Sequence, residues 1–107
     1  MNFVKRSTEG YREIVPSILM HPLAHGEKTN MIETNLAKGG VHQLHSRPYE
    51  QSGYLIPGKT RLTVESQRYD VEPGDSWCIP ADVKHAMEIL EDAVIVEIFS
   101  PVREEYL

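Results

Sequence analysis

The chain has 107 residues, of which 40% are hydrophobic and 25% charged, and its formal net charge at pH 7 is −5. This length allows one domain with one core, and the acidic balance argues against a nucleic-acid partner, because phosphate binding needs a basic face. No apolar run approaches the ~18 residues that a membrane-spanning helix needs, and the N-terminus lacks the apolar core of a secretory signal. The lone cysteine, Cys78, excludes an intrachain disulfide and fits a reducing compartment, so we expect a cytoplasmic protein.

Turn signals recur about every eight to twelve residues, which is the spacing expected of an all-β sandwich or barrel. The segment 59–65 alternates most clearly, with Thr60, Leu62 and Val64 on one face. No segment has the period of an amphipathic helix, so we expect less than about one-tenth helix, confined to a turn in the tail. The predicted strands, in chain order, are 29–37, 51–56, 59–65, 76–79, 84–90 and 93–99, the last two forming a hairpin across Glu91 and Asp92.

The predicted strand 93–99 is mostly apolar on both faces. One face carries Val94, Val96 and Ile98, and the other carries Ala93, Ile95, Glu97 and Phe99. A strand of this kind should see little water on either side. We therefore expect one face to fill a barrel and the other to be covered by the N-terminal strands or by a second subunit, which predicts a homodimer.

Two segments place polar side chains in predicted hairpins that begin at Gly or Pro turns. The first runs from Gly39 through His45 to Gln51, and the second from Pro73 to His85. Side chains of this kind in the mouth of a small barrel form a ligand or metal site. Burying three polar groups without a shared purpose is costly, so we expect them to share one site. Met87 has the parity of His85 and is predicted to form the apolar wall of the pocket.

The order and separation of these residues resemble the two motifs of the cupin superfamily. The resemblance implies a single cupin domain over residues 1–107, folded as a double-stranded β-helix, which is the RmlC-like jelly-roll barrel. It also implies that His45, Gln51 and His85 hold a divalent metal ion. Imidazole nitrogen and amide oxygen suit Ni, Zn, Fe, Mn or Co, and this ligand set does not choose among them.

One position departs from the cupin motif, because Arg47 stands where a second histidine is usual. A guanidinium cannot ligate a cation, and four alternatives follow. In the first alternative, the metal is held by three protein ligands with open positions. His42 replaces the lost ligand, which requires a bulge because it lies three residues from His45. No metal is bound, and Arg47, which shares the parity of His45, binds an anion directly. In the fourth alternative, Arg47 points to solvent and takes no part in the site.

The C-terminal segment is similar to the ending of small cupins of the KdgF type, which are associated with pectin and alginate breakdown. Phe99, Ser100, Pro101 and Arg103 match that ending, and Glu97 replaces its aspartate. The resemblance implies that Glu97 is an acid/base group, that Arg103 clamps a carboxylate and that Phe99 is a wall of the site. The alternative is that Arg103 only pairs with Glu97 or Glu104.

These observations predict a small metal-binding cupin that acts on a small anionic sugar-derived metabolite, with Arg47, Phe99 and Met87 contacting it. The KdgF resemblance implies that a 4,5-unsaturated uronate is isomerised to its linear keto form. A metal-dependent cupin oxygenase or lyase is an alternative, although the loss of a ligand histidine counts against it. A non-catalytic cupin that binds a metabolite is another, because fold does not fix function.

Four further residues have simpler interpretations. His21 and His25 flank an early turn and are expected to be solvated loop residues. Trp77 and Cys78 lie in a short apolar strand and are expected to be buried in the core, where a thiol is inert.

Overall fold

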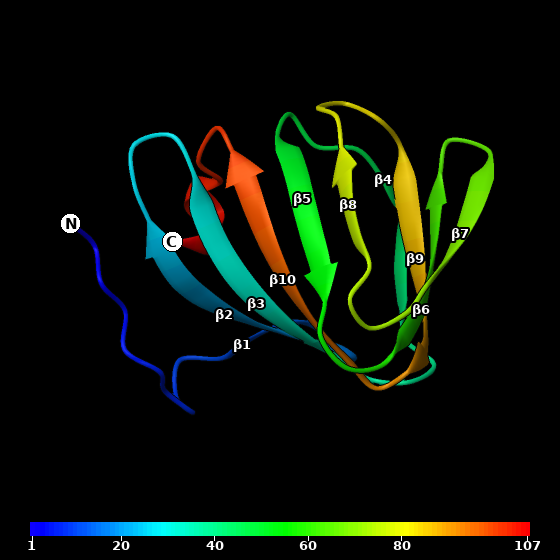
Figure 1. Ribbon diagram of the computed structural model, residues 1–107, viewed down its shortest axis with the longest axis horizontal. Helices are drawn as coiled ribbons and strands as arrows, with labels where there is room; N and C mark the ends of the chain where they lie inside the picture. Colours follow the sequence, from blue (N-terminus) through cyan, green and yellow to red (C-terminus); the bar gives the residue numbers. More distant parts are fainter.

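The computed structural model describes residues 1–107 as two antiparallel β-sheets that face each other, with a single short 3-10 helix near the C-terminus (Figure 1). The six-stranded sheet has the order β1 (Arg12–Val15), β2 (Ile18–His25), β3 (Asn30–Leu36), β10 (Ala93–Ser100), β5 (Glu50–Leu55) and β8 (Ser76–Ile79). The four-stranded sheet has the order β4 (Val41–His45), β9 (His85–Glu91), β6 (Lys59–Val64) and β7 (Gln67–Val71). The helix η1 spans Glu104–Tyr106, and no helix has the length and apolarity to cross a bilayer. The all-β jelly-roll prediction is confirmed.

Alternating side chains place the core between the two sheets. In β3 every second residue is buried, and in β10 the buried residues Ala93, Ile95 and Phe99 lie on one of the two faces that the sequence distinguished. The main core has ten buried residues: Ile18, Leu36, Leu55, Leu62, Val71, Ile79, Met87, Ile89, Ala93 and Ile95. A smaller cluster of Met20, Ile32 and Phe99 has Tyr49 and Tyr106 packed against it. Residues of both clusters contribute to the walls of one cavity.

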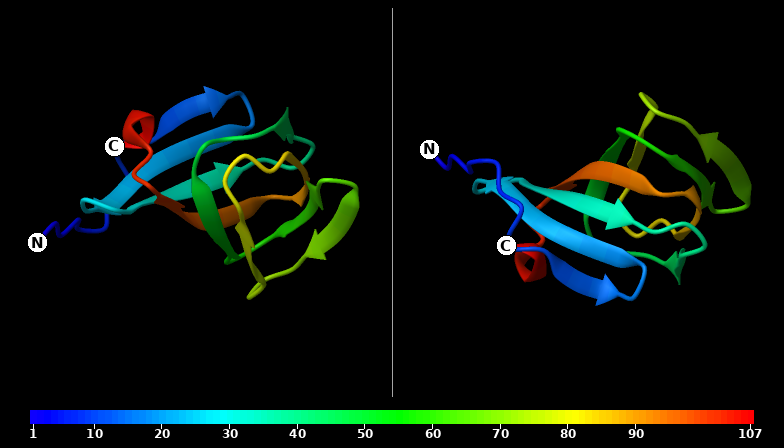
Figure 2. Two further views of the ribbon diagram at one scale, coloured as in Figure 1. Left: turned by 90° about the horizontal axis from the view of Figure 1, so that it is seen from above. Right: turned by 90° about the horizontal axis from the view of Figure 1, so that it is seen from below.

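The predicted hairpin between residues 84–90 and 93–99 is wrong. β9 pairs with β4 and β6 in the four-stranded sheet, whereas β10 pairs with β3 and β5 in the six-stranded sheet. The connections β4–β5 and β8–β9 likewise pass from one sheet to the other, as the views along the barrel show (Figure 2). A short turn looks the same in sequence whether the chain returns to the same sheet or crosses to the opposite one. This crossing brings the polar residues of opposite sheets to face one another.

The N-terminal strands were expected as a cover for the sheet, but the sequence did not indicate their bounds. β2 pairs with β3, with Met20 opposite Thr34, and β1 adds an outer strand beside β2. The register shifts between Pro22 and His25, which interrupts the alternation that reveals a strand. The expectation that His21 is a solvated loop residue is wrong, because it is buried in β2 with the ring of Tyr11 at 4.6 Å. His25 is exposed at the end of the same strand.

Candidate functional site

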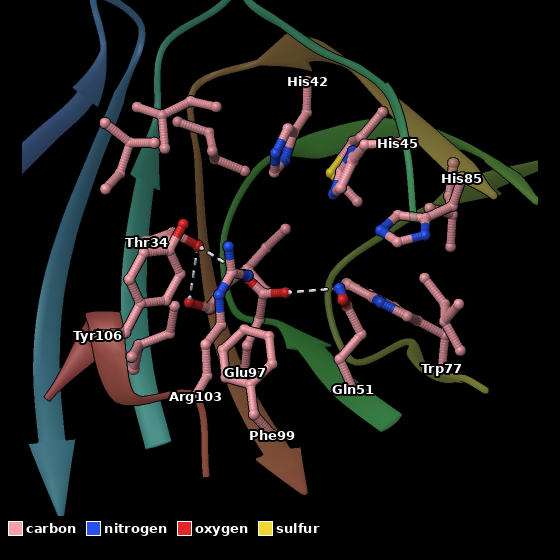
Figure 3. Close-up of a pocket in the computed structure, with 18 residues that line it drawn as sticks. Thr34, His42, His45, Gln51, Trp77, His85, Glu97, Phe99, Arg103 and Tyr106 are labelled. Atoms are coloured by element: carbon pink, nitrogen blue, oxygen red, sulfur yellow. Dashed lines mark hydrogen bonds between the residues drawn. The ribbon is translucent and has the colours of Figure 1, made fainter. Parts of the chain in front are cut away.

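A small cavity of about 40 Å³ lies between the sheets and collects the polar residues of both (Figure 3). β4 and β9 supply His42, His45 and His85 on one side. β5 and β10 supply Gln51 and Glu97, and Arg103 enters from the C-terminal segment. This space is enough for an ion or a few water molecules, so a sugar-sized ligand must extend toward the open mouth of the barrel.

His45 and His85 lie opposite each other in the β4–β9 pair, and their ring centroids are 4.3 Å apart. His45 Nδ1 lies 2.7 Å from the carbonyl oxygen of Gln43, and His85 Nδ1 lies 2.9 Å from that of Val83. Each ring therefore donates from Nδ1 and keeps Nε2 as an acceptor. His85 Nε2 is buried without a hydrogen-bond partner. This tautomer, fixed by a backbone carbonyl, is the one that metal-binding histidines use.

Gln51 is held in one orientation by the carboxylate next to it. Its Nε2 donates to Glu97 Oε2 at 3.3 Å, and its Oε1 is buried without a partner. An unpaired buried acceptor is costly, and two of them, Gln51 Oε1 and His85 Nε2, line the same cavity. The donor set therefore fits a divalent cation. No three His, Cys, Asp or Glu side chains converge on one point, so a cation bound here would draw on the Gln51 amide oxygen beside the imidazoles.

His42 also faces the cavity, although strict alternation would turn it away from His45. The register of β4 against β9 shifts between His42 and His45, and this irregularity puts both rings on the same side. The two rings stack with centroids 4.4 Å apart and planes at 22°. Burial, followed by the nearby His45 and His85, lowers the pKa of His42 to about 4, and burial also lowers the pKa of His45. Both imidazoles are therefore neutral at pH 7, as metal ligation requires.

Arg47 does not line this cavity, and the prediction that it points into the barrel with His45 is wrong. β4 ends at His45, so the alternation on which that prediction rested does not continue to Arg47. The half-buried side chain lies along an outer groove that His42 and His45 also line. Its Nη1 donates only to the carbonyl oxygen of Ser46, at 3.4 Å. Arg47 is therefore placed at the rim of the site.

Glu97 lies between Thr34 and Gln51 on the floor of the cavity (Figure 3). Its Oε1 accepts a hydrogen bond from Thr34 Oγ1 at 3.5 Å. Burial raises the pKa of Glu97 to about 7, and the positive charge of Arg103 and the hydrogen bond from Thr34 oppose this shift. A carboxyl group with such a pKa exchanges a proton readily near neutral pH.

Arg103 is buried and held in place on several sides. Its Nε donates to Glu105 Oε1 at 2.8 Å, and its guanidinium carbon lies 3.9 Å from the centroid of the Tyr106 ring and 5.1 Å from that of Phe99. Its backbone N–H donates to Asn30 Oδ1 at 2.7 Å, which ties the C-terminal segment to β3. The pairing of Arg103 with Glu97 or Glu104 considered from the sequence is not observed. Both Nη groups make no hydrogen bond to protein and line the cavity, where they suit a carboxylate.

The sequence interpretation missed part of the cavity wall. Trp77, expected in the core, is half-buried and lines the cavity, together with Thr34 and Tyr106. Phe99 and Met87 line it as predicted. The prediction that Cys78 is buried is wrong, because its side chain is exposed. In β8, Trp77 has the parity of the buried Ile79, and Cys78 has the opposite parity, so the period of two contained this information.

Comparisons with known proteins agree with this architecture. A family model for the cupin domain matches residues 32–100, so the chain belongs to the cupin family. The structure is similar to that of KdgF from Halomonas sp., with a TM-score of 0.92 and 24% identity over 98% of this chain and 99% of that one. It is also similar to an RmlC-like cupin from Shewanella frigidimarina NCIMB 400, with a TM-score of 0.91 and 20% identity over 98% of this chain and 95% of that one. The expected cupin fold is therefore confirmed, and the likeness to KdgF is a likeness of fold.

The sequence also matches one curated enzyme. It is 25% identical over 80 residues to oxalate decarboxylase OxdC of Bacillus subtilis (strain 168), which covers 70% of this chain and 21% of that protein. The chain thus spans about a fifth of that relative's length. This likeness does not extend to the rest of OxdC.

Proposed function

We propose that this cupin isomerises a small anionic sugar derivative, a 4,5-unsaturated uronate, to its linear keto form at a divalent metal ion held by His45, Gln51 and His85. The observation that carries the proposal is the contact between the Glu97 carboxylate and the Gln51 amide in a cavity that Arg103 and the histidines also line. The structural likeness to KdgF over nearly the whole of both chains supports it.

The reaction needs one group that takes a proton and returns it to another atom. The C1 hydroxyl of the cyclic hemiacetal loses its proton, the C1=O bond forms, and the bond between C1 and the ring oxygen breaks. The electron pair passes to the ring oxygen, which leaves an enolate across C4 and C5. A proton added at C4 then gives the 5-keto product, and the atomic composition does not change. Glu97 accepts the first proton and supplies the second.

The remaining residues bind and orient the substrate. Arg103 holds the carboxylate through its two Nη groups, while Glu105 and the Tyr106 ring keep the guanidinium in position. Phe99 and Met87 form the apolar wall that limits water around the reacting atoms. Arg47 meets the anion at the rim of the site.

The metal would be held by Nε2 of His45, Nε2 of His85 and Oε1 of Gln51. When bound, such an ion supplies Lewis-acid stabilisation of negative charge on oxygen. The hydrogen bond from Gln51 to Glu97 keeps the amide oxygen turned toward the two imidazoles. This donor set accommodates Ni, Zn, Fe, Mn or Co. The exposed thiol of Cys78 supports a reducing, cytoplasmic compartment for the activity.

The test follows the loss of ultraviolet absorbance of an unsaturated uronate after elemental analysis of the purified protein. We expect a rate above the spontaneous reaction that falls when the metal is chelated and returns when it is supplied. Oxalate serves as a control substrate because of the match to OxdC, and we expect no turnover of it. If metal-loaded protein does not exceed the spontaneous rate, a non-catalytic binding cupin becomes the better interpretation.

A further inference from the structure

The cavity contains one histidine more than the cupin motif accounts for. The motif assigns His45 and His85, and His42 lies beside them on the same wall (Figure 3). The usual third histidine is replaced by Arg47, which lies outside the cavity. We infer that His42 takes the place of that lost ligand, so that His42, His45, His85 and Gln51 form the metal site. This inference rests on the metal ion of the proposed function.

The irregularity in β4 is the structural cause. In a regular strand, residues three apart point to opposite faces. The register shift between His42 and His45 removes this opposition and aims both rings at the cavity. The histidine usual in the motif would follow His45 at position 47, whereas His42 precedes His45. The segment 42–47 therefore still supplies a second imidazole, from the N-terminal side of His45.

The environment of His42 fits a ligand better than a structural side chain. Neither of its ring nitrogens forms a hydrogen bond with the protein, although the residue is half-buried and lines the cavity. Its ring centroid is 4.4 Å from that of His45, which in turn is 4.3 Å from that of His85. The stacked rings at 22° do not yet aim their nitrogens at one point. We expect the His42 side chain to rotate about its own torsions when a metal binds, so that one ring nitrogen turns toward the other two rings.

The use of His42 as a ligand also explains why an arginine is tolerated at position 47, where cupins usually have a ligand histidine. A guanidinium inside the cavity would repel a divalent cation. Because β4 ends at His45, Arg47 lies at the rim instead. Three imidazoles and one amide oxygen complete a four-ligand set, which leaves positions open for substrate oxygens on ions that accept higher coordination.

The test measures metal binding without any substrate. Chelator-stripped protein is titrated with Co²⁺, and its affinity is measured by calorimetry while the visible absorption bands report the nitrogen ligands. We expect His42→Ala to weaken Co²⁺ binding at least ~10-fold and to change the bands, as His45→Ala does. Gln43→Ala, on the exposed face of the same strand, is the matched control and should change the affinity less than ~3-fold.

The double variant His42→Ala/Arg47→His gives the sharpest result. It places an imidazole at the position usual in the motif, but position 47 lies outside the cavity, so we expect it not to recover the Co²⁺ affinity that His42→Ala loses. His42→Gln repeats the measurement with a side chain closer in size, and circular dichroism verifies that each variant is folded. Wild-type affinity and unchanged bands in both folded His42 variants would overturn the inference. A wild-type protein that binds Co²⁺ through His42 but does not convert unsaturated uronates would overturn only the proposed function.

Discussion

Glu97 connects the two halves of the proposed mechanism. Its carboxylate accepts a hydrogen bond from the amide of Gln51, which is itself one of the proposed metal ligands. The positive charge of Arg103 partly offsets the rise in the pKa of Glu97 that burial causes. One side chain thus orients a ligand and exchanges a proton. Glutamate is one methylene longer than the aspartate of the KdgF-type ending, and here its extra length is accommodated between Thr34 and Gln51.

Replacing Glu97 with glutamine tests the proton transfer. The amide keeps the size of the side chain but cannot accept and return a proton, so we expect turnover of the unsaturated uronate to fall by ~10²–10⁴-fold. Metal content should change little, because Gln51 keeps a hydrogen-bond partner. Steady-state kinetics and elemental analysis of the same preparation measure both quantities. A variant with near wild-type turnover would rule out Glu97 as the acid/base group.

The same variant makes a prediction about stability and pH in metal-free protein. Burial raises the pKa of Glu97 from 4.5 to about 7 in the folded state. The folded state therefore binds the proton more tightly than the unfolded state, and the resulting stabilisation is lost as the pH rises from about 4.5 to about 7. Relative to wild type, Glu97→Gln should gain stability between pH 5 and pH 8, by at most about 3 kcal/mol at ~1.4 kcal/mol per pKa unit. Urea unfolding in the presence of a chelator gives the difference, and an equal difference at both pH values would contradict the prediction.

Arg103 should affect substrate binding more than turnover. Removing a carboxylate clamp that acts in both the ground and transition states raises KM with little change in kcat, and we expect Arg103→Ala to raise KM ~10–100-fold. The variant should also melt at a lower temperature, because Arg103 packs against Tyr106 and Phe99. Glu105→Gln is the matched control, since it weakens the contact with Nε but keeps the guanidinium, and its KM should stay close to that of wild type. A change confined to kcat in Arg103→Ala would show that the clamp is misassigned.

At the scale of elements, the cavity depends on how closely β5 and β8 approach. Gly53 of β5 pairs with Trp77 of β8, and the indole lies directly over the glycine. A Cβ at position 53 would come within 2.3 Å of Trp77 Cζ2. The glycine is therefore required by packing, and it fixes the indole where it forms part of the cavity wall.

We expect Gly53→Ala to destabilise the protein by about 1–3 kcal/mol, because the indole must move or the strands must separate. Trp77 is the only tryptophan, so a shift of its fluorescence reports this displacement directly. Gly26→Ala is the control, because nothing lies within 4 Å of a Cβ at that position. Urea unfolding followed by fluorescence should separate the two variants clearly. Equal midpoints and unchanged emission in Gly53→Ala would contradict the packing argument.

At the scale of the whole molecule, the outer face of the six-stranded sheet retains apolar side chains. Leu19, Tyr54 and Ile98 are 41%, 50% and 38% exposed, and they come from β2, β5 and β10. The N-terminal strand β1 does not cover this face at β10, because it pairs with β2 toward the edge of the sheet. We therefore keep the proposal of a homodimer and place its contact on this face.

Light scattering at micromolar concentration should give the mass of two 12.2 kDa chains. A charge on this face should separate the subunits, so Tyr54→Arg is expected to give a monomer that remains folded. Tyr69→Arg, at an exposed position of β7 in the other sheet, should remain a dimer. A wild-type monomer would refute the dimer, and a dimeric Tyr54→Arg would place the contact elsewhere.

The sequence by itself determined which side chains share the interior of the barrel. The period of two correctly grouped the residues that share a face of β10, and the spacing of the two motifs indicated His45, Gln51 and His85, which the structure brings to one cavity. These features follow from alternation along a strand and from the order of residues, which are local properties of the chain. That these residues hold a metal, and that Glu97 and Arg103 act on a uronate, stay predictions.

The tertiary structure alone decided which strands pair, where the alternation of side chains fails and how burial in the cavity changes the pKa of a side chain. It placed β9 and β10 in opposite sheets, turned His42 inward through the register shift in β4 and left Arg47 beyond the end of that strand. It also raised the pKa of Glu97, because residues distant in sequence enclose its carboxylate. Each of these features depends on partners brought together across the two sheets, and no local pattern in the sequence specifies such partners.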